Sequence, residues 1–179
     1  MAVGRDLNKS RPPLDQAALE QLALRYVGRY ATSRARLCRY LERKLKDRGW
    51  ADTDDPSIDD VAARMVQLGY VDDAAFASAR SAELSRRGYG PRRVREALRA
   101  AGIADEDALA AATEAQGEAW AAALRLARRR SIGPFAAAEP DRRDRERALG
   151  VLLRAGHSMD VARRLAFARP GEFPPEDGG

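Results

Sequence analysis

Three stretches of the chain share one pattern, in which a helical run of apolar residues ends at a glycine four residues after a leucine. These glycines are Gly49, Gly102 and Gly156, and they lie 53 and then 54 residues apart. A glycine just beyond a helix readily adopts the left-handed conformation in which the last carbonyl groups of the helix find donors. The chain therefore repeats about every 50 residues.

Helical spacing around these glycines predicts an all-α protein. Apolar residues recur at every third or fourth position in two segments before each glycine and in one segment after it. Only 6% of the residues are aromatic, and alanine supplies much of the 45% apolar content, which favours closely packed helices over a sheet. In the first repeat the predicted stripes are Leu19, Leu22, Ala23, Tyr26 and Tyr30, then Leu37, Leu41 and Leu45, then Ile58, Val61, Ala62, Met65 and Leu68.

Several helix starts can be predicted from the residues that precede the apolar stripes. Ser33 and Ser158 are placed to cap helices with their hydroxyl groups. Pro91 follows a glycine and suits the first helical position, where the missing N–H costs nothing. Near the start of the third helix, either Ser57 or Asp55 fits as the cap.

A unit of three short helices buries little apolar surface by itself, so we expect the units to stack side by side. The predicted fold is three tandem three-helix repeats in an elongated, curved array. Both ends of the chain lack helical periodicity and are rich in turn formers, which is typical of disordered tails. The predicted boundaries are 1–15 for the N-terminal tail, 16–72, 73–117 and 118–168 for the repeats, and 169–179 for the C-terminal tail.

The segment LGYVDD, residues 68–73, raises the question of whether its paired aspartates form a catalytic or metal site. Asp72 or Asp73 is placed to begin a helix, where a carboxylate accepts bonds from free N–H groups. Acid/base chemistry would need further groups nearby, and the only histidine, His157, takes a position that is apolar in the other repeats. No phosphate-binding loop, zinc spacing or nucleophile elbow occurs in the sequence. We therefore expect no enzyme, no catalytic residue, no metal and no cofactor.

The remaining bulk features indicate a cytoplasmic protein. No run of about 18 apolar residues is present, and the N-terminus carries charges and prolines where a signal peptide would be apolar. The single cysteine, Cys38, has no partner for an internal disulfide, and we interpret it as a helix-surface or core residue. No membrane and no small-molecule substrate are expected as partners.

Charge is sorted by segment along the chain. Residues 25–48 contain nine basic residues and two acids, and residues 80–99 contain seven basic residues and two acids. Between them, residues 51–62 contain five aspartates and no basic residue. The basic segments could attract phosphates or an acidic protein surface, although arginine at helical spacing is also typical of an ordinary solvated face.

Two segments of the middle repeat point to a known family. The sequences GYVDDAAFA, residues 69–77, and GYGPRRVREALRAAGI, residues 88–103, resemble the RecX family of recombinase regulators. The resemblance extends from about Leu22 to Leu165 and implies three tandem three-helix repeats. It also implies a protein that binds the RecA recombinase and its filament on single-stranded DNA. Such proteins reduce the ATPase, strand-exchange and coprotease activities of RecA, and so act in DNA recombination, DNA repair and the SOS response.

A basic stripe along the repeats agrees with such a partner. Arginines could bind a helical polyanion, and in the segment GPRR, residues 90–93, a helix start adds free N–H groups to two arginines as an anion clamp. The arginines could also contact nucleic acid weakly by themselves. The candidate binding residues are Arg34, Arg36, Arg39, Arg43, Arg86, Arg87, Arg92, Arg93, Arg95, Arg128, Arg129 and Arg130.

An alternative function from a different class stays open. Helix pairs separated by short breaks, with arginine at a helix start, are also typical of helix-turn-helix-like DNA-binding modules. Sequence-selective binding to duplex DNA would favour this alternative over a regulator of RecA.

Overall fold

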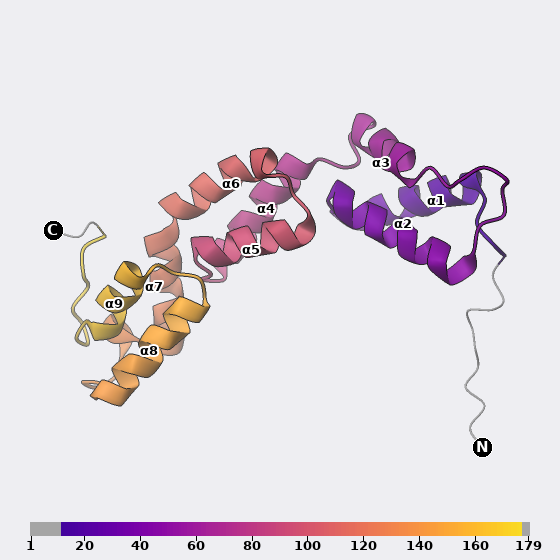
Figure 1. The fold of residues 1–179 in the computed structure, drawn as a ribbon. Helices are drawn as coiled ribbons and strands as arrows, with labels where there is room; N and C mark the ends of the chain where they lie inside the picture. Colours follow the sequence, from indigo (N-terminus) through magenta and orange to yellow (C-terminus); the bar gives the residue numbers. More distant parts are fainter. Residues whose placement is uncertain (1–11, 177–179) are drawn as a thin grey trace, which may run out of the picture. The chain divides into compact units, whose positions relative to one another are not determined.

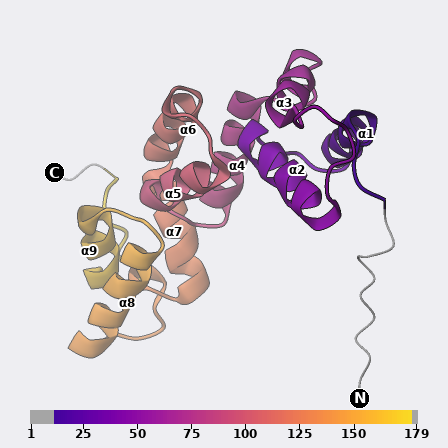
Figure 2. The same ribbon diagram turned by 45° about the vertical axis from the view of Figure 1, so that its right-hand side comes forward.

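The computed structural model describes residues 12–176, which form nine α-helices and one short 3-10 helix (Figures 1 and 2). Within this range the only β-type pairing is an isolated bridge between Leu14 and Trp50, so the predicted all-α fold class is confirmed. The helices are α1 (Gln16–Val27), α2 (Arg34–Arg48), α3 (Ile58–Gln67), α4 (Asp73–Arg86), α5 (Pro91–Ala101), α6 (Asp105–Gly117), α7 (Ala119–Arg130), η1 (Gly133–Phe135), α8 (Arg142–Arg154) and α9 (Met159–Phe167).

The chain divides into two compact units. Unit 1 is delimited by Met1–Phe76 with Ala101–Ile103, and unit 2 by Ala77–Ala100 with Ala104–Gly179. The helix order agrees with the three predicted trios, α1–α3, α4–α6 and α7–α9. The division into three repeats and their curved arrangement stay predictions.

The core of unit 1 lies between α1, α2 and α3, which pack on one another. The side chains that the three helices bury in this core come from their predicted stripes. They are Leu19 and Ala23 from α1, Leu37 and Leu41 from α2, and Val61, Ala62 and Met65 from α3. Tyr30 departs from its predicted stripe, because α1 ends at the Gly28 cap and leaves Tyr30 in the following turn.

The N-terminal boundary differs from the expected tail, of which residues 1–11 lie outside the described range. Leu14 is fully buried in the core of unit 1. Its N–H donates to the carbonyl of Gly49 at 2.9 Å, and its carbonyl accepts from the N–H of Ala51 at 2.8 Å. Asp15 caps α1 by accepting from the N–H of Ala18 at 2.7 Å. Residues 12–15 therefore belong to unit 1, because one apolar side chain and one cap attach them to it.

The main core of unit 2 lies between α7, α8 and α9. Trp120, Leu126, Leu152 and Leu165 are buried there with several alanines. The segment that follows α9 was expected to be a tail, but as far as residue 176 it contacts this unit. The ring of Phe173 meets Phe135 edge-on at a centroid distance of 5.2 Å, and the N–H of Gly171 donates to the carbonyl of Pro134 at 2.9 Å.

The three repeating glycines have the predicted conformation. Gly49, Gly102 and Gly156 have φ values of 82°, 75° and 94°, a region that side chains disfavour. Ser33 and Ser158 cap α2 and α9 as predicted, and α5 begins at Pro91. Ser57 is the residue before α3, but its side chain makes no capping hydrogen bond.

Candidate partner-binding surface

The paired aspartates of residues 68–73 are helix caps. Asp72 precedes α4 and its carboxylate accepts from the N–H of Ala75 at 2.8 Å. Asp73 is the first residue of α4, yet its carboxylate accepts from the N–H of Arg34 at 2.8 Å, at the start of α2. Each aspartate therefore serves a different helix. Within residues 12–176 no group of three or more His, Cys, Asp and Glu side chains could hold a metal ion.

His157 is a packing residue. It is only 4% exposed, and its Nε2 lies 3.1 Å from the carbonyl oxygen of Gly88, to which the ring donates. Its Nδ1 is buried and has no hydrogen-bond partner among the described residues. Burial lowers the pKa of His157, and the bond to Gly88 opposes that shift only in part, so the neutral ring is favoured.

Cys38 lies half-buried beside the core of unit 1. Burial is the largest influence on its thiol and raises the pKa above its ordinary value, although Arg34 acts in the opposite direction. A raised pKa keeps the thiol protonated and poorly nucleophilic. This agrees with the interpretation of Cys38 as a packing residue.

The four candidate arginines of unit 1 do not share one face of α2. Because successive residues of a helix are about 100° apart, Arg36, Arg39 and Arg43 lie on one side and Arg34 on the other. Arg34 pairs with Asp59 of α3 at 2.8 Å. The guanidinium of Arg36 lies over the ring of Phe76 at 5.7 Å, and that of Arg43 lies over Tyr40 at 5.8 Å. Arg39 donates to the carbonyl of Ala101 at 3.4 Å.

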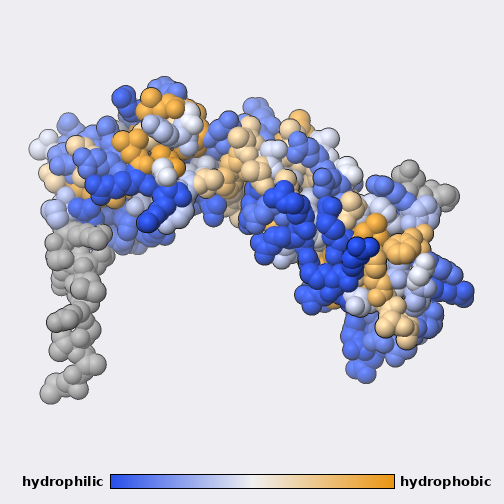
Figure 3. Space-filling view, turned by 180° about the vertical axis from the view of Figure 1, so that it is seen from behind, coloured by the Kyte–Doolittle hydropathy of each residue, from blue (hydrophilic) through white to orange (hydrophobic). Residues whose placement is uncertain are grey.

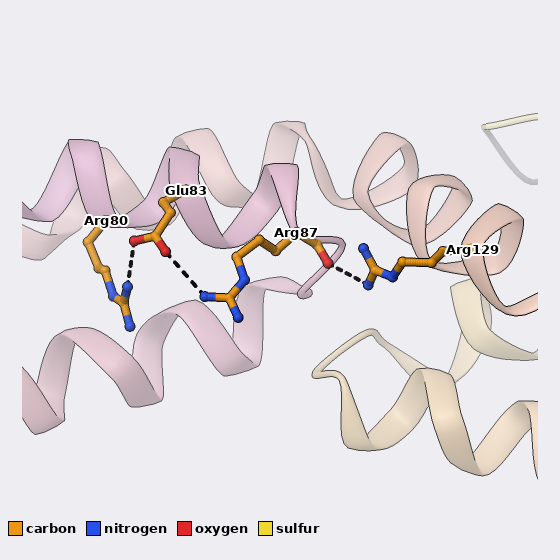
Figure 4. A network of polar contacts seen from close by, with 4 residues as sticks. All are labelled: Arg80, Glu83, Arg87 and Arg129. Atoms are coloured by element: carbon orange, nitrogen blue, oxygen red, sulfur yellow. Dashed lines mark hydrogen bonds and ion pairs between the residues drawn. The ribbon is translucent and has the colours of Figure 1, made fainter.

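In unit 2 the structure brings arginines of α4 and α7 together (Figure 4). Glu83 binds Arg80 on one side and Arg87 on the other, with an Arg87 Nη1–Glu83 Oε1 distance of 3.2 Å. Arg129 donates from Nη2 to the carbonyl of Arg87 at 2.7 Å. The hydrogen bond from Arg80 is the main reason why the pKa of Glu83 is lowered, so Glu83 stays ionised between the arginines. We call Arg80, Glu83, Arg87 and Arg129 the α4–α7 arginine cluster.

The start of α5 does not form the predicted anion clamp. The N–H of Arg92 donates to the carbonyl of Gly156 at 3.2 Å, and its guanidinium donates to the carbonyl of Leu153 at 2.7 Å. Arg93 pairs with Glu96 at 3.2 Å. The positive N-terminal end of α5 therefore meets the negative C-terminal end of α8, and carbonyl oxygens take the place predicted for an anion. Local sequence does not indicate this contact, which joins segments about 60 residues apart.

The other candidate arginines of unit 2 are exposed. Arg128 lies over the ring of Phe135 at 5.1 Å. For Arg86, Arg95 and Arg130 the described part of the chain offers no ion pair. Figure 3 shows hydrophilic side chains over much of the face opposite to that of Figure 1, with apolar side chains in smaller patches. The predicted continuous stripe stays a prediction, and the structure adds Arg80, which the sequence interpretation missed.

These features define a class of protein: an all-helical protein in which the polar groups described above are helix caps and surface arginines. Within residues 12–176 no helix is both long and apolar enough to cross a membrane. Comparison with known proteins then identifies the family. Residues 72–111 match the family model described as "RecX, second three-helix domain".

Relatives that match 80% or more of the chain carry the same name. The chain is 30% identical to "Regulatory protein RecX" of Myxococcus xanthus (strain DK1622), over 93% of this chain and 96% of that protein. It is 34% identical to "Regulatory protein RecX" of Mycobacterium sp. (strain JLS), over 80% and 79% of the two chains. The chain therefore belongs to the RecX family of regulatory proteins.

Solved structures agree with the fold. The crystal structure of RecX from Lactobacillus salivarius matches with a TM-score of 0.59 and 21% identity, over 82% of this chain and 90% of that chain. A second crystal structure, of a regulatory protein RecX, matches with a TM-score of 0.57 and 25% identity, over 82% of this chain and 68% of that chain.

Proposed function

We propose that this protein binds RecA and the RecA filament on single-stranded DNA and thereby lowers the ATPase, strand-exchange and coprotease activities of RecA. The observation that carries the proposal is the similarity to regulatory proteins named RecX over nearly their whole length. The action is that of a binding protein in the cytoplasm, with no reaction catalysed and no cofactor. Its partners are RecA protein and the filament, and any contact with DNA alone is weak.

The arginines of unit 2 support a contact with an anionic partner surface. The α4–α7 arginine cluster joins three guanidinium groups with a single carboxylate, so its net charge is positive. Two further exposed arginines are next to the cluster in sequence, Arg86 before Arg87 and Arg130 after Arg129. Guanidinium groups bind carboxylates and phosphates with paired hydrogen bonds, which suits either the protein or the DNA of a filament.

The geometry of α5 argues against the alternative of a helix-turn-helix-like DNA-binding module. A recognition helix reads bases with residues near its N-terminus. Here the turn before α5 is buried against the end of α8: Gly90 and Gly156 are so close that a Cβ on Gly90 would lie 2.5 Å from the Gly156 carbonyl. Duplex titration tests the alternative, because a specificity ratio of about a thousandfold or more would favour it.

RecA assays test the proposal directly. Purified protein is added to RecA on single-stranded DNA with ATP, and ATP hydrolysis and co-sedimentation with filaments are measured. We expect inhibition and co-sedimentation at equimolar amounts. Unchanged hydrolysis together with absence from the filament pellet would overturn the proposal.

A paired variant tests the contribution of unit 2. Arg86→Ala with Arg130→Ala removes two exposed charges, and since an exposed ion pair contributes about 0.2–1 kcal/mol, the half-inhibitory concentration should rise about 2- to 30-fold. Arg142→Ala with Arg143→Ala removes the same charge from α8, where the side chain of Arg142 is 92% exposed, and serves as the control. Equal effects of the two variants would remove Arg86 and Arg130 from the contact. Arg92 is unsuitable for this test because its loss would also break the contact between α5 and α8.

A further inference from the structure

Unit 1 contains a surface groove in whose lining Arg43 is the one residue that is also a candidate of the predicted basic stripe. It lies between the C-terminal halves of α1 and α2, with a volume of about 420 Å³. Its polar lining consists of three tyrosines and four cations, and the described residues that line it include no carboxylate. They are Tyr26, Tyr30 and Tyr40 with Arg25, Arg29, Arg43 and Lys44, next to Leu22. We call this site the tyrosine groove.

The tyrosine rings form a connected platform. Tyr26 and Tyr40 stack with a centroid distance of 4.2 Å and an interplanar angle of 16°. Tyr30 leans on Tyr26 at 5.3 Å and 50°, and it is 52% exposed. The turn after α1 fixes its backbone, because the N–H of Tyr30 donates to the carbonyl of Tyr26 at 2.9 Å. The platform therefore presents one accessible aromatic ring in a defined place.

The cations around the platform have no carboxylate partner in the part of the chain that the structure describes. Arg43 and Lys44 lie over the ring of Tyr40 at 5.8 and 5.7 Å. Arg25 and Arg29 are exposed, and no ion pair involving any of the four is found among the described residues. Four positive charges beside an open aromatic ring match a ligand that carries both negative charges and flat rings. Single-stranded nucleic acid has this combination, since its bases stack on aromatic side chains while its phosphates bind Arg and Lys.

We infer that the tyrosine groove is a direct binding site for single-stranded nucleic acid, in which a base stacks on Tyr30 and neighbouring phosphates contact Arg25, Arg29, Arg43 and Lys44. An acidic peptide would satisfy the cations but would leave the aromatic ring without a stacking partner. A duplex keeps its bases stacked inside and could use only the charges. Because stacking and phosphate contacts do not involve the sugar, strands of DNA and RNA should bind alike. The inference rests on the weak contact with DNA alone that the proposed function includes, and it assigns that contact to named residues. Because the site acts without RecA, it can fail separately from the inhibition of RecA.

The test is a fluorescence-anisotropy titration without RecA, using a labelled oligothymidylate of about 15 nucleotides, at the upper end of the site size of single-strand binding folds. Since stacking contributes about 1–3 kcal/mol per base, Tyr30→Ala should weaken binding about 5- to 150-fold, whereas Tyr30→Phe should leave it nearly unchanged. Tyr70→Ala is the matched control, because Tyr70 is 56% exposed but lies outside the groove. Circular dichroism confirms that the variants are folded.

Charge is tested with Arg25→Gln and Arg29→Gln together. Each phosphate contact on a single strand contributes about −0.7 to the slope of log K against log salt, so this variant should have a slope shallower by about 1.4. Three results would overturn the inference: equal weakening by the Tyr30 and Tyr70 substitutions, equal binding of a duplex of the same length, or equal binding of poly-glutamate. A strong preference for oligouridylate over oligodeoxyuridylate would also overturn it, because these two strands differ only in the sugar. None of these results would contradict the proposed inhibition of RecA, which is measured in a separate assay.

Discussion

Replacing Gly90 by alanine tests whether the start of α5 and the end of α8 are in backbone contact. A Cβ on Gly90 would lie 2.5 Å from the carbonyl carbon and oxygen of Gly156 and 2.6 Å from the nitrogen of His157. These are backbone atoms and cannot turn aside as a flexible side chain can. The substitution would also stretch the bonds from Gly90 N–H to Ala155 and from Arg92 N–H to Gly156, which measure 2.9 and 3.2 Å.

The expected loss follows from these contacts. Overpacking costs about 1–3 kcal/mol, and each hydrogen bond contributes about 1 kcal/mol, so Gly90→Ala should lower the free energy of unfolding by about 3 kcal/mol. With a urea m-value of about 2 kcal/mol/M, the midpoint of unfolding should fall by about 1.5 M. Gly117→Ala is the control, because a Cβ added to Gly117 at the end of α6 would meet nothing within 4 Å beyond the adjoining backbone of its own helix and alanine favours helix.

The assay can be restricted to unit 2. Trp120 is buried in the core of unit 2 and the other tryptophan, Trp50, lies in unit 1. In a Trp50→Phe background, tryptophan fluorescence therefore follows the unfolding of unit 2 alone. Equal urea midpoints for the Gly90→Ala and Gly117→Ala variants in this background would refute the close contact between α5 and α8.

Three further predictions concern single side chains. Burial lowers the pKa of His157 below its ordinary 6.5, so just below that pH the unfolded chain binds more protons than the folded chain. The free energy of unfolding should therefore be highest above pH 6.5 and fall on acidification by up to about 1.4 kcal/mol per pH unit. Urea titrations of the His157→Phe variant should lack this slope. Ser33→Ala should lower the free energy of unfolding, measured with urea, by about 1–3 kcal/mol, because the buried hydroxyl both caps α2 and donates to the carbonyl of Ala101 at 2.7 Å. Ser33→Thr keeps a hydroxyl and should lower it less. Asp72→Ala should lower the free energy of unfolding by about 0.5–2 kcal/mol. Asp72→Asn should have a melting temperature close to that of the unsubstituted protein, since asparagine also caps helices. A large loss of stability in the Asn variant would indicate a role that needs the negative charge.

Local features were predictable from the sequence because they depend on neighbours within one helical turn. The glycines that end helices, the caps Ser33 and Ser158, and the helix start at Pro91 all depend on such neighbours. The contacts that the sequence did not indicate join distant segments. Asp73 accepts from Arg34, 39 residues earlier, and Leu14 reaches the core from a stretch without helical periodicity.

The same distinction applies to the candidate arginines. Composition and spacing indicated basic helices, but they could not show which guanidinium groups are used within the fold. Arg92 and Arg129 donate to backbone carbonyls of other helices, and Arg34 pairs with Asp59. Tyr26, Tyr30 and Tyr40 were interpreted as core or went unremarked, although the spacing of Tyr26 and Tyr30 next to Arg25 and Arg29 could have signalled an aromatic and basic surface.

A second role for arginine follows from where these side chains donate. Arg125 and Arg129 of α7 donate to the carbonyls of Ser85 and Arg87 at the end of α4, at 3.1 and 2.7 Å, and Arg92 does the same at the end of α8. The last carbonyls of a helix have no intrahelical donor and carry its negative dipole end, so a guanidinium group satisfies both needs at once. Short helices have many such ends per residue. Part of the arginine content of this chain therefore stabilises the packing of its helices. The arginines whose guanidinium groups bind no carbonyl or carboxylate among the described residues are the ones best able to bind a partner surface.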